Sequence, residues 1–140
     1  MKNKIIHMFQ WKLSDIKDNL QKIKEAGFGF VQISPIQKGK FNNPEDDWWK
    51  LYQPYKYEIG NGLGTKEDLI ELCTEASKLD IKIVADILFR QLADGQNGEL
   101  NELCDKDFLE NYDYMLHTYR GNNEQERYEV CNCSWGLPPS

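Results

Sequence analysis

A single aspartate interrupts the apolar stretch at residues 81–91, which read IKIVADILFRQ. Ile81 and Ile83 give this stretch the β-branched, apolar character of a buried strand, and Asp86 stands near its far end. A carboxylate at this place is expected in a parallel β/α fold, because the carboxyl ends of the strands carry the active site. Asp86 is therefore a candidate site residue.

The elements that would position Asp86 can be read from hydrophobic spacing. Strands are predicted over residues 4–11, 28–34 and 81–89. Apolar residues at three- and four-residue spacing predict two amphipathic helices between them. The stripe of the first helix is Leu13, Ile16, Leu20 and Ile23, and that of the second is Leu69, Leu72, Cys73, Ala76 and Leu79.

The ends of both helices carry capping signals. Ser14 is predicted as the N-cap of the first helix, and Gly27 as its C-cap. Thr65 is predicted to cap the second helix with Asp68 in a capping-box position, and Asp80 to end it. Cys73 is expected in the core.

The order of elements is strand, helix, strand, a long aromatic connection over residues 36–62, helix, strand. This alternation predicts an α/β fold with a parallel sheet. Residues 93–140 differ, since they begin with turn-like residues. Within them we expect one further helix and a short strand over 128–130; the helix is marked by Phe108, Tyr112, Met115 and Leu116.

Composition excludes several classes of function. The chain has 140 residues, a net charge of −6 and a pI near 4.9, which argue against a nucleic-acid partner. No apolar run approaches the roughly 18 residues that span a bilayer. The N-terminus lacks the pattern of a signal peptide, so a soluble, cytoplasmic chain with reduced cysteines is expected.

Cys131 and Cys133 are separated by one residue, whereas strong zinc signatures use about two to four, so no metal site is predicted there.

Four segments together resemble a known family. They read IIHMFQWKLSDI, AGFGFVQISPIQ, WWKLYQPYKYEIGNGLGTKEDL and LDIKIVADILF. The chain resembles the N-terminal part of α-amylases of Gram-positive bacteria, glycoside hydrolases built on a TIM-type β/α barrel. The resemblance implies that residues 1–92 form about three β/α units of a barrel. It also implies that residues 93–140 are part of a segment inserted after the third strand.

The resemblance assigns sugar contacts to the long connection. Aromatic faces cover the apolar faces of a sugar ring, and amide or carboxylate groups hydrogen-bond its hydroxyls. Tyr52 would stack on the sugar and Gln53 would hydrogen-bond a hydroxyl. Without the resemblance, Tyr52 would be read as an aromatic residue at the solvent boundary and Gln53 as its polar neighbour. Trp48 and Trp49 would stack on further sugars or pack under the loop, and both readings stay open. His7 is expected to be structural.

The end of the third strand departs from the family pattern. Asp86 matches a carboxylate that orients neighbouring groups beneath the site. The family continues to an Asn that binds calcium and a His that contacts sugar, but this chain has Arg90 and Gln91 there. Arginine offers only hydrogen-bond donors and a positive charge, whereas calcium takes oxygen ligands. No metal or cofactor is therefore predicted, and Gln91 is expected to bond a sugar hydroxyl.

Glycoside hydrolysis needs two carboxylates, and the family places these on strands four and five, beyond this chain. No catalytic residue is assigned. From the family resemblance we expect an α-amylase-like hydrolase that acts on starch or another α-glucan. We expect this chain to be a truncated form that is inactive on its own. Its expected partners are an α-glucan or oligosaccharide and either a complementing C-terminal barrel fragment or a second copy. Two alternatives are a non-catalytic glucan-binding relic, or pseudoenzyme fragment, and a protein-interaction module that uses open sheet edges.

Overall fold

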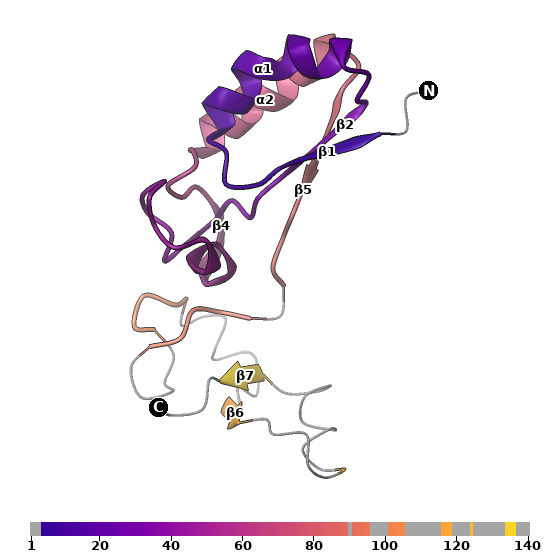
Figure 1. Cartoon of the computed structure of the whole chain (residues 1–140). Helices are drawn as coiled ribbons and strands as arrows, with labels where there is room; N and C mark the ends of the chain where they lie inside the picture. The colour runs from indigo at the N-terminus through magenta and orange to yellow at the C-terminus, as the bar shows by residue number, and fades with distance from the viewer. Residues whose placement is uncertain are drawn as a thin grey trace.

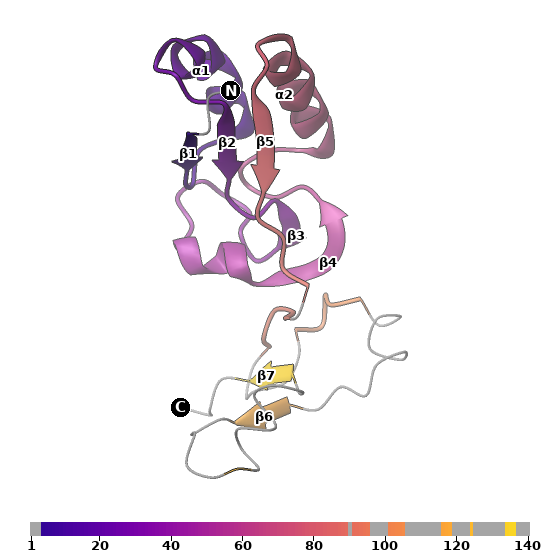
Figure 2. The same cartoon turned by 90° about the vertical axis from the view of Figure 1, so that its right-hand side faces the viewer.

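A three-stranded parallel sheet forms the centre of the computed structural model, which describes residues 4–89, 91–95, 101–105, 116–118, 124 and 134–136. The strands are β1 (Ile5–Met8), β2 (Phe30–Ile33) and β5 (Lys82–Ala85), and they lie side by side in that order (Figure 2). Each connection carries a helix, α1 (Leu13–Glu25) and α2 (Lys66–Lys78). The predicted α/β class with parallel pairing is therefore confirmed.

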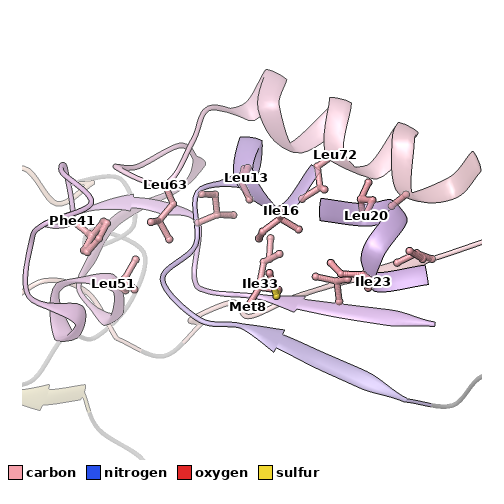
Figure 3. Packing of buried hydrophobic residues seen from close by; sticks show 14 residues of the cluster. Met8, Leu13, Ile16, Leu20, Ile23, Ile33, Phe41, Leu51, Leu63 and Leu72 are labelled. Carbon is pink, nitrogen blue, oxygen red and sulfur yellow. The ribbon is translucent and has the colours of Figure 1, made fainter. Parts of the chain in front are cut away.

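Both helices cover the same face of the sheet (Figure 1). The core fills the space between the two layers, as Figure 3 shows. Side chains of a strand alternate between faces, so Val31 and Ile33 of β2 point to the helices and are almost fully buried. From the helices come apolar residues at helical spacing, of which the buried ones are Leu13, Ile16, Leu20, Ile23, Leu72 and Ala76.

No helix among the described residues covers the opposite face of the sheet. The register places Ile5, Phe30 and Lys82 in one row across the strands. The next row on this face is His7, Gln32 and Val84. Phe30 and Gln32 are half-buried and the other four are exposed, and the Lys82 ammonium lies 6.0 Å from the centroid of the Phe30 ring. Parallel sheets normally have both faces covered, so this open face is unusual.

The start of α1 differs from the prediction. The N-cap is Lys12, and Ser14 lies inside the first turn with its hydroxyl toward the Asp15 carboxylate. The predicted N-cap at Ser14 is therefore wrong. The reason is a tertiary contact: the Leu13 N–H donates to the Leu63 carbonyl at 2.9 Å, which satisfies a helix-end donor without a capping side chain. Gly27 closes the other end at φ 90°, directly after the C-cap Ala26.

The predicted capping box of α2 is confirmed. The Asp68 N–H donates to the Thr65 hydroxyl at 3.1 Å, and the Thr65 N–H donates to the Asp68 carboxylate at 2.8 Å. Asp80 follows the helix in the left-handed region, at φ 55°. Cys73 is exposed, so its predicted place in the core is wrong; Leu72 and Ala76 alone are fully buried on this helix.

The long connection is more regular than its sequence indicates. It contains β3 (Gln37–Gly39), the 3-10 helix η1 (Trp48–Tyr52) and β4 (Pro54–Ile59), and β3 pairs with β4 in an antiparallel sheet. Gly39 allows the close approach of these strands, because a Cβ there would clash with the Gln53 carbonyl and lie 2.8 Å from Pro54 Cα.

The described residues beyond 92 begin by pairing with β4. The Ala93 N–H donates to the Pro54 carbonyl at 2.8 Å, and the Asp105 N–H donates to the Tyr55 carbonyl at 3.1 Å. The short strands β6 (Leu116–Thr118) and β7 (Ser134–Gly136) form a separate parallel pair. Leu116 was predicted to be helical and begins β6 instead. Phe108, Tyr112, Met115 and residues 128–130 lie outside the described residues, and the boundary at residue 92 stays a prediction.

Candidate functional site

The carboxyl ends of the three parallel strands meet at one edge of the sheet. In Figure 2 the arrows of β1, β2 and β5 all point toward the β3–β4 sheet. Phe9, Ser34 and Asp86 are the first residues beyond these strands. The Gln10 N–H donates to the Ser34 hydroxyl at 2.7 Å, which ties the ends of β1 and β2 together. This edge is where a parallel β/α fold places its site.

The segment before η1 is fixed by a carboxylate. Asp46 accepts hydrogen bonds from the backbone N–H groups of Asn42 and Asn43, at 2.9 and 3.0 Å, and from the Lys50 ammonium at 2.6 Å. The Lys50 hydrogen bond, followed by the two backbone donors, lowers the pKa of Asp46 to about 2. The Gln10 side chain also donates to the Asp46 carbonyl, at 3.1 Å. The loop that carries Trp48 is thereby attached to the end of β1.

Four aromatic rings form a continuous row at this edge, which we call the aromatic ladder: His7, Phe9, Trp48 and Tyr52. Their successive centroid distances are 5.5, 6.4 and 6.1 Å, and the first and last pairs meet edge to face. Phe9 is 36% exposed and Trp48 is 56% exposed. A row of partly exposed rings presents flat apolar surface beside polar groups, which suits a ligand with both characters.

Tyr52 connects the ladder to the polar end of β5. Burial, and secondarily the negative charge of Asp86, raises the pKa of the Tyr52 hydroxyl. The side chain of Gln91 donates to the Tyr52 carbonyl at 2.6 Å. The phenol is protonated at neutral pH and can donate a hydrogen bond.

Gln53 carries the one unpartnered buried side-chain atom among the described residues, its Oε1. Its backbone is fully used, because its N–H donates to the Lys50 carbonyl at 3.1 Å and its carbonyl accepts from the Lys40 N–H at 3.0 Å. A buried acceptor without a donor costs about 1–3 kcal/mol. A hydrogen-bond donor that reached this atom would therefore be favourable.

Comparison with known proteins identifies the family. No family model matches the sequence. The chain is 35% identical over 139 residues to an α-amylase of Clostridium acetobutylicum, and the match covers 96% of this chain and 18% of that protein.

The chain belongs to the α-amylase family.

Solved α-amylases share the architecture. An α-amylase from Anoxybacillus superposes with a TM-score of 0.62 at 25% identity, over 91% of this chain and 26% of that one. A variant of α-amylase I from Eisenia fetida, solved with maltohexaose, superposes with a TM-score of 0.60 at 27% identity, over 65% of this chain and 18% of that one. The chain spans 18% and 29% of the length of the first two curated relatives it matches.

The residues to which the α-amylase resemblance assigns sugar contacts lie in one region. Trp48 and Gln91 both contact Tyr52, Gln53 adjoins it in sequence, and the charge of Asp86 acts on its hydroxyl. Trp49 is 43% exposed and has no ring contact within the described residues. Arg90 lies outside the described residues. His7 is exposed on the open sheet face and contacts Phe9.

Two contributors to the site were missed in the sequence. Phe9 joins the aromatic ladder, and the signal for it was the alternation of β1, which puts Phe9 on the same side as His7. Asp46 fixes the loop before η1, and the run Asn42-Asn43-Pro44 that marks turns was the available hint for an acceptor nearby.

The family resemblance implies a calcium site, and Arg90 stands where its Asn ligand is expected. Among the described residues no three His, Cys, Asp or Glu side chains gather as metal ligands. Arg90, at the position of the expected Asn, supplies donors where calcium needs oxygen. Cys131 and Cys133 lie outside the described residues. In the part of the chain that is described, neither helix is long and apolar enough to span a membrane.

Proposed function

We propose that this chain binds an α-linked glucan oligosaccharide at the strand-end site, as part of an α-amylase-like glycoside hydrolase. The aromatic ladder, which ends at Tyr52, and the position of Asp86 directly after β5 carry the proposal. Both lie at the carboxyl edge of the parallel sheet, where aromatic faces and a carboxylate supply the apolar surface and the hydroxyl acceptor that a sugar ring needs.

Each residue of the site has a role in this proposal. Tyr52 stacks on the sugar ring, and the unpartnered Oε1 of Gln53 accepts a hydrogen bond from a hydroxyl. Asp86 orients the Tyr52 phenol and the sugar hydroxyls. Trp48 and Trp49 extend the apolar surface to neighbouring sugars, which their exposure supports.

Gln91 would contribute less than the family's His at this position. Its amide already donates to the Tyr52 carbonyl, so it holds the binding residue as well as lining the site. Within the proposal Gln91 keeps one amide hydrogen and its carbonyl oxygen for a hydroxyl.

The proposal assigns no hydrolysis to this chain alone. Retaining glycosidases hold two carboxyl groups roughly 5 Å apart, and no residue here is assigned as acid or nucleophile. Chemistry would require carboxylates from further strands of a TIM-type barrel, of which residues 1–92 would supply about three β/α units. The open sheet face, with Ile5 and Val84 exposed, favours pairing with such a complement, either a C-terminal barrel fragment or a second copy.

Titration of the purified 140-residue chain with maltohexaose tests the binding proposal, followed by calorimetry or tryptophan fluorescence. Cellohexaose, which has the same sugar in β linkage, is the control ligand. We expect saturable binding of maltohexaose and at least several-fold weaker binding of cellohexaose.

Two substitutions locate the site. Tyr52→Leu removes the aromatic face and Gln53→Leu removes the acceptor, and each is expected to weaken maltohexaose binding about 3- to 10-fold. Phe89→Leu, in which an exposed ring stacked on Tyr57 is lost, is the matched control and should bind normally. Absence of saturable binding to the folded wild-type chain would overturn the proposal.

A further inference from the structure

Phe9 is neither buried in the core nor fully exposed to solvent. It follows the last residue of β1, is 36% exposed, and contacts two rings. Its centroid lies 5.5 Å from that of His7, at an interplanar angle of 70°, and 6.4 Å from that of Trp48, at 59°. Phe9 therefore bridges the parallel sheet and η1.

The orientation of Trp48 depends on such contacts. Trp48 is the first residue of the short helix η1, and the cap residue before it makes no side-chain capping bond. With 56% of its surface exposed, it has little surrounding core to fix its rotamer. Among the described residues its ring contacts are Phe9 and Tyr52, the latter at 6.1 Å and 79°. Aromatic pairs in tilted and edge-to-face arrangements are attractive, so the two neighbours restrict the indole plane.

We infer that Phe9 is a positioning residue, which holds the Trp48 ring in the orientation that stacks on a bound sugar. The expected effect on sugar affinity rests on the proposed glucan binding. The contact between the Phe9 and Trp48 rings does not depend on that proposal. Because Phe9 belongs to the sheet edge, it fixes the indole relative to Asp86 and Tyr52. The effect on affinity is pre-organisation: a ring that is already oriented loses less freedom on binding.

The first measurement uses no sugar. Near-ultraviolet circular dichroism reports the asymmetry around tryptophan rings, and Phe9→Leu is expected to reduce the Trp48 contribution. The same substitution in a Trp48→Phe background should leave the spectrum almost unchanged, and Phe9→Tyr should retain the wild-type signal. Far-ultraviolet spectra establish that each variant is folded, and Phe9→Met serves if Phe9→Leu does not fold.

The second measurement is the affinity for maltohexaose. Phe9→Leu is expected to weaken binding about 2- to 10-fold, Phe9→Tyr to restore it, and Phe89→Leu to have no effect. In a Trp48→Leu background, Phe9→Leu should add no further loss, because the ring that it positions is absent.

The two measurements separate the two proposals. An unchanged near-ultraviolet spectrum in Phe9→Leu, or an equal change in the Trp48→Phe background, overturns the positioning role. Equal loss of affinity with and without Trp48 also overturns it, because Phe9 would then act by another route. If the wild-type chain does not bind maltohexaose, the proposed function and the affinity consequence both fail, and the spectra still decide the ring geometry.

Discussion

The buried amide of Gln37 exchanges two hydrogen bonds with the backbone of Leu88. Its Nε2 donates to the Leu88 carbonyl at 3.1 Å, and the Leu88 N–H donates to its Oε1 at 2.7 Å. Gln37 is 6% exposed and belongs to β3, whereas Leu88 lies between Asp86 and Gln91. One side chain thus takes the place of a strand partner and fixes the segment that carries two site residues.

Replacing Gln37 with methionine should destabilise the chain. Gln37→Met keeps the side-chain length and removes both hydrogen-bonding groups, so the Leu88 N–H and carbonyl lose their partners. We expect the free energy of unfolding to fall by about 1–3 kcal/mol, measured by urea denaturation. Gln21→Met, which removes an exposed hydrogen bond to Glu25, should change it by less than about 0.5 kcal/mol. Equal effects of the two variants would contradict this assignment.

Asp46 makes stability depend on pH in the acid range. Its hydrogen bonds from Lys50 and from two backbone N–H groups lower its pKa in the folded state to about 2, below its value in the unfolded chain. Its contribution is therefore present above about pH 4 and is lost as the pH falls toward 2.

Urea midpoints measured between pH 6 and pH 2.5 test this dependence. The difference in midpoint between the wild type and Asp46→Asn should be largest near pH 6 and shrink steadily below pH 4. Lys50→Met removes the largest cause of the pKa shift and should reduce the same difference. A gap between wild type and Asp46→Asn that stays constant down to pH 2.5 would show that Asp46 does not titrate as stated.

Gly39 is expected to tolerate no side chain. A Cβ at this position would meet the Gln53 carbonyl and Pro54 Cα, both backbone groups that cannot rotate away. Gly39→Ala should lower the free energy of unfolding by about 1–3 kcal/mol and displace the backbone of Gln53. Lys38→Ala, at the exposed neighbour, is the control in the same thermal or urea measurement, and a neutral Gly39→Ala would mean that β3 and β4 can separate.

The chain alone should not hydrolyse starch. The reaction needs an acid and a second carboxylate, whereas of the carboxylates described at the strand-end site Asp86 is expected to orient its neighbours and Asp46 is held by Lys50 and two backbone N–H groups. A reducing-sugar assay on soluble starch should give the same value for the purified chain as for a mock purification. Activity above the mock value that co-purifies with the chain would refute the prediction.

Calcium should leave the melting temperature unchanged. A ligand that binds only the folded state raises stability, but Arg90 stands where an oxygen ligand is expected. After chelator treatment, thermal unfolding with and without added calcium chloride is therefore expected to coincide. A rise of several degrees would demonstrate a calcium site and contradict this reading of Arg90.

Local signals predicted the layers of this fold better than its connections. The stripe of α1 and the Thr65–Asp68 box depend on neighbours in sequence, and both were read correctly. Ser14 and Cys73 were misplaced because a distant carbonyl of Leu63 caps α1 and because Leu72 and Ala76 suffice to fill the core. The pairing of β3 with β4 was missed, since the approach at Gly39 is a long-range contact.

In the candidate site, too, some features could be read from the local sequence and others depend on long-range contacts. Spacing and resemblance pointed to Tyr52 and Asp86, but the arrangement of the aromatic ladder depends on how β1 and η1 meet in space. Nothing in the sequence near Phe9 states that its ring lies against Trp48, 39 positions away by residue number. Likewise the attachment of Gln91 to the Tyr52 carbonyl requires the folded path of the chain after β5.

The parallel sheet and both of its covering helices are complete by Ala85, which has a consequence for biosynthesis. Each strand pairs with the strand of the preceding β/α unit, so the units can dock one after another as they leave the ribosome. The residues that join the strand-end site last, Asp86 and Gln91, emerge only after this platform exists. A nascent chain should therefore already resist protease over β1 to β5 once residue 95 has left the ribosome.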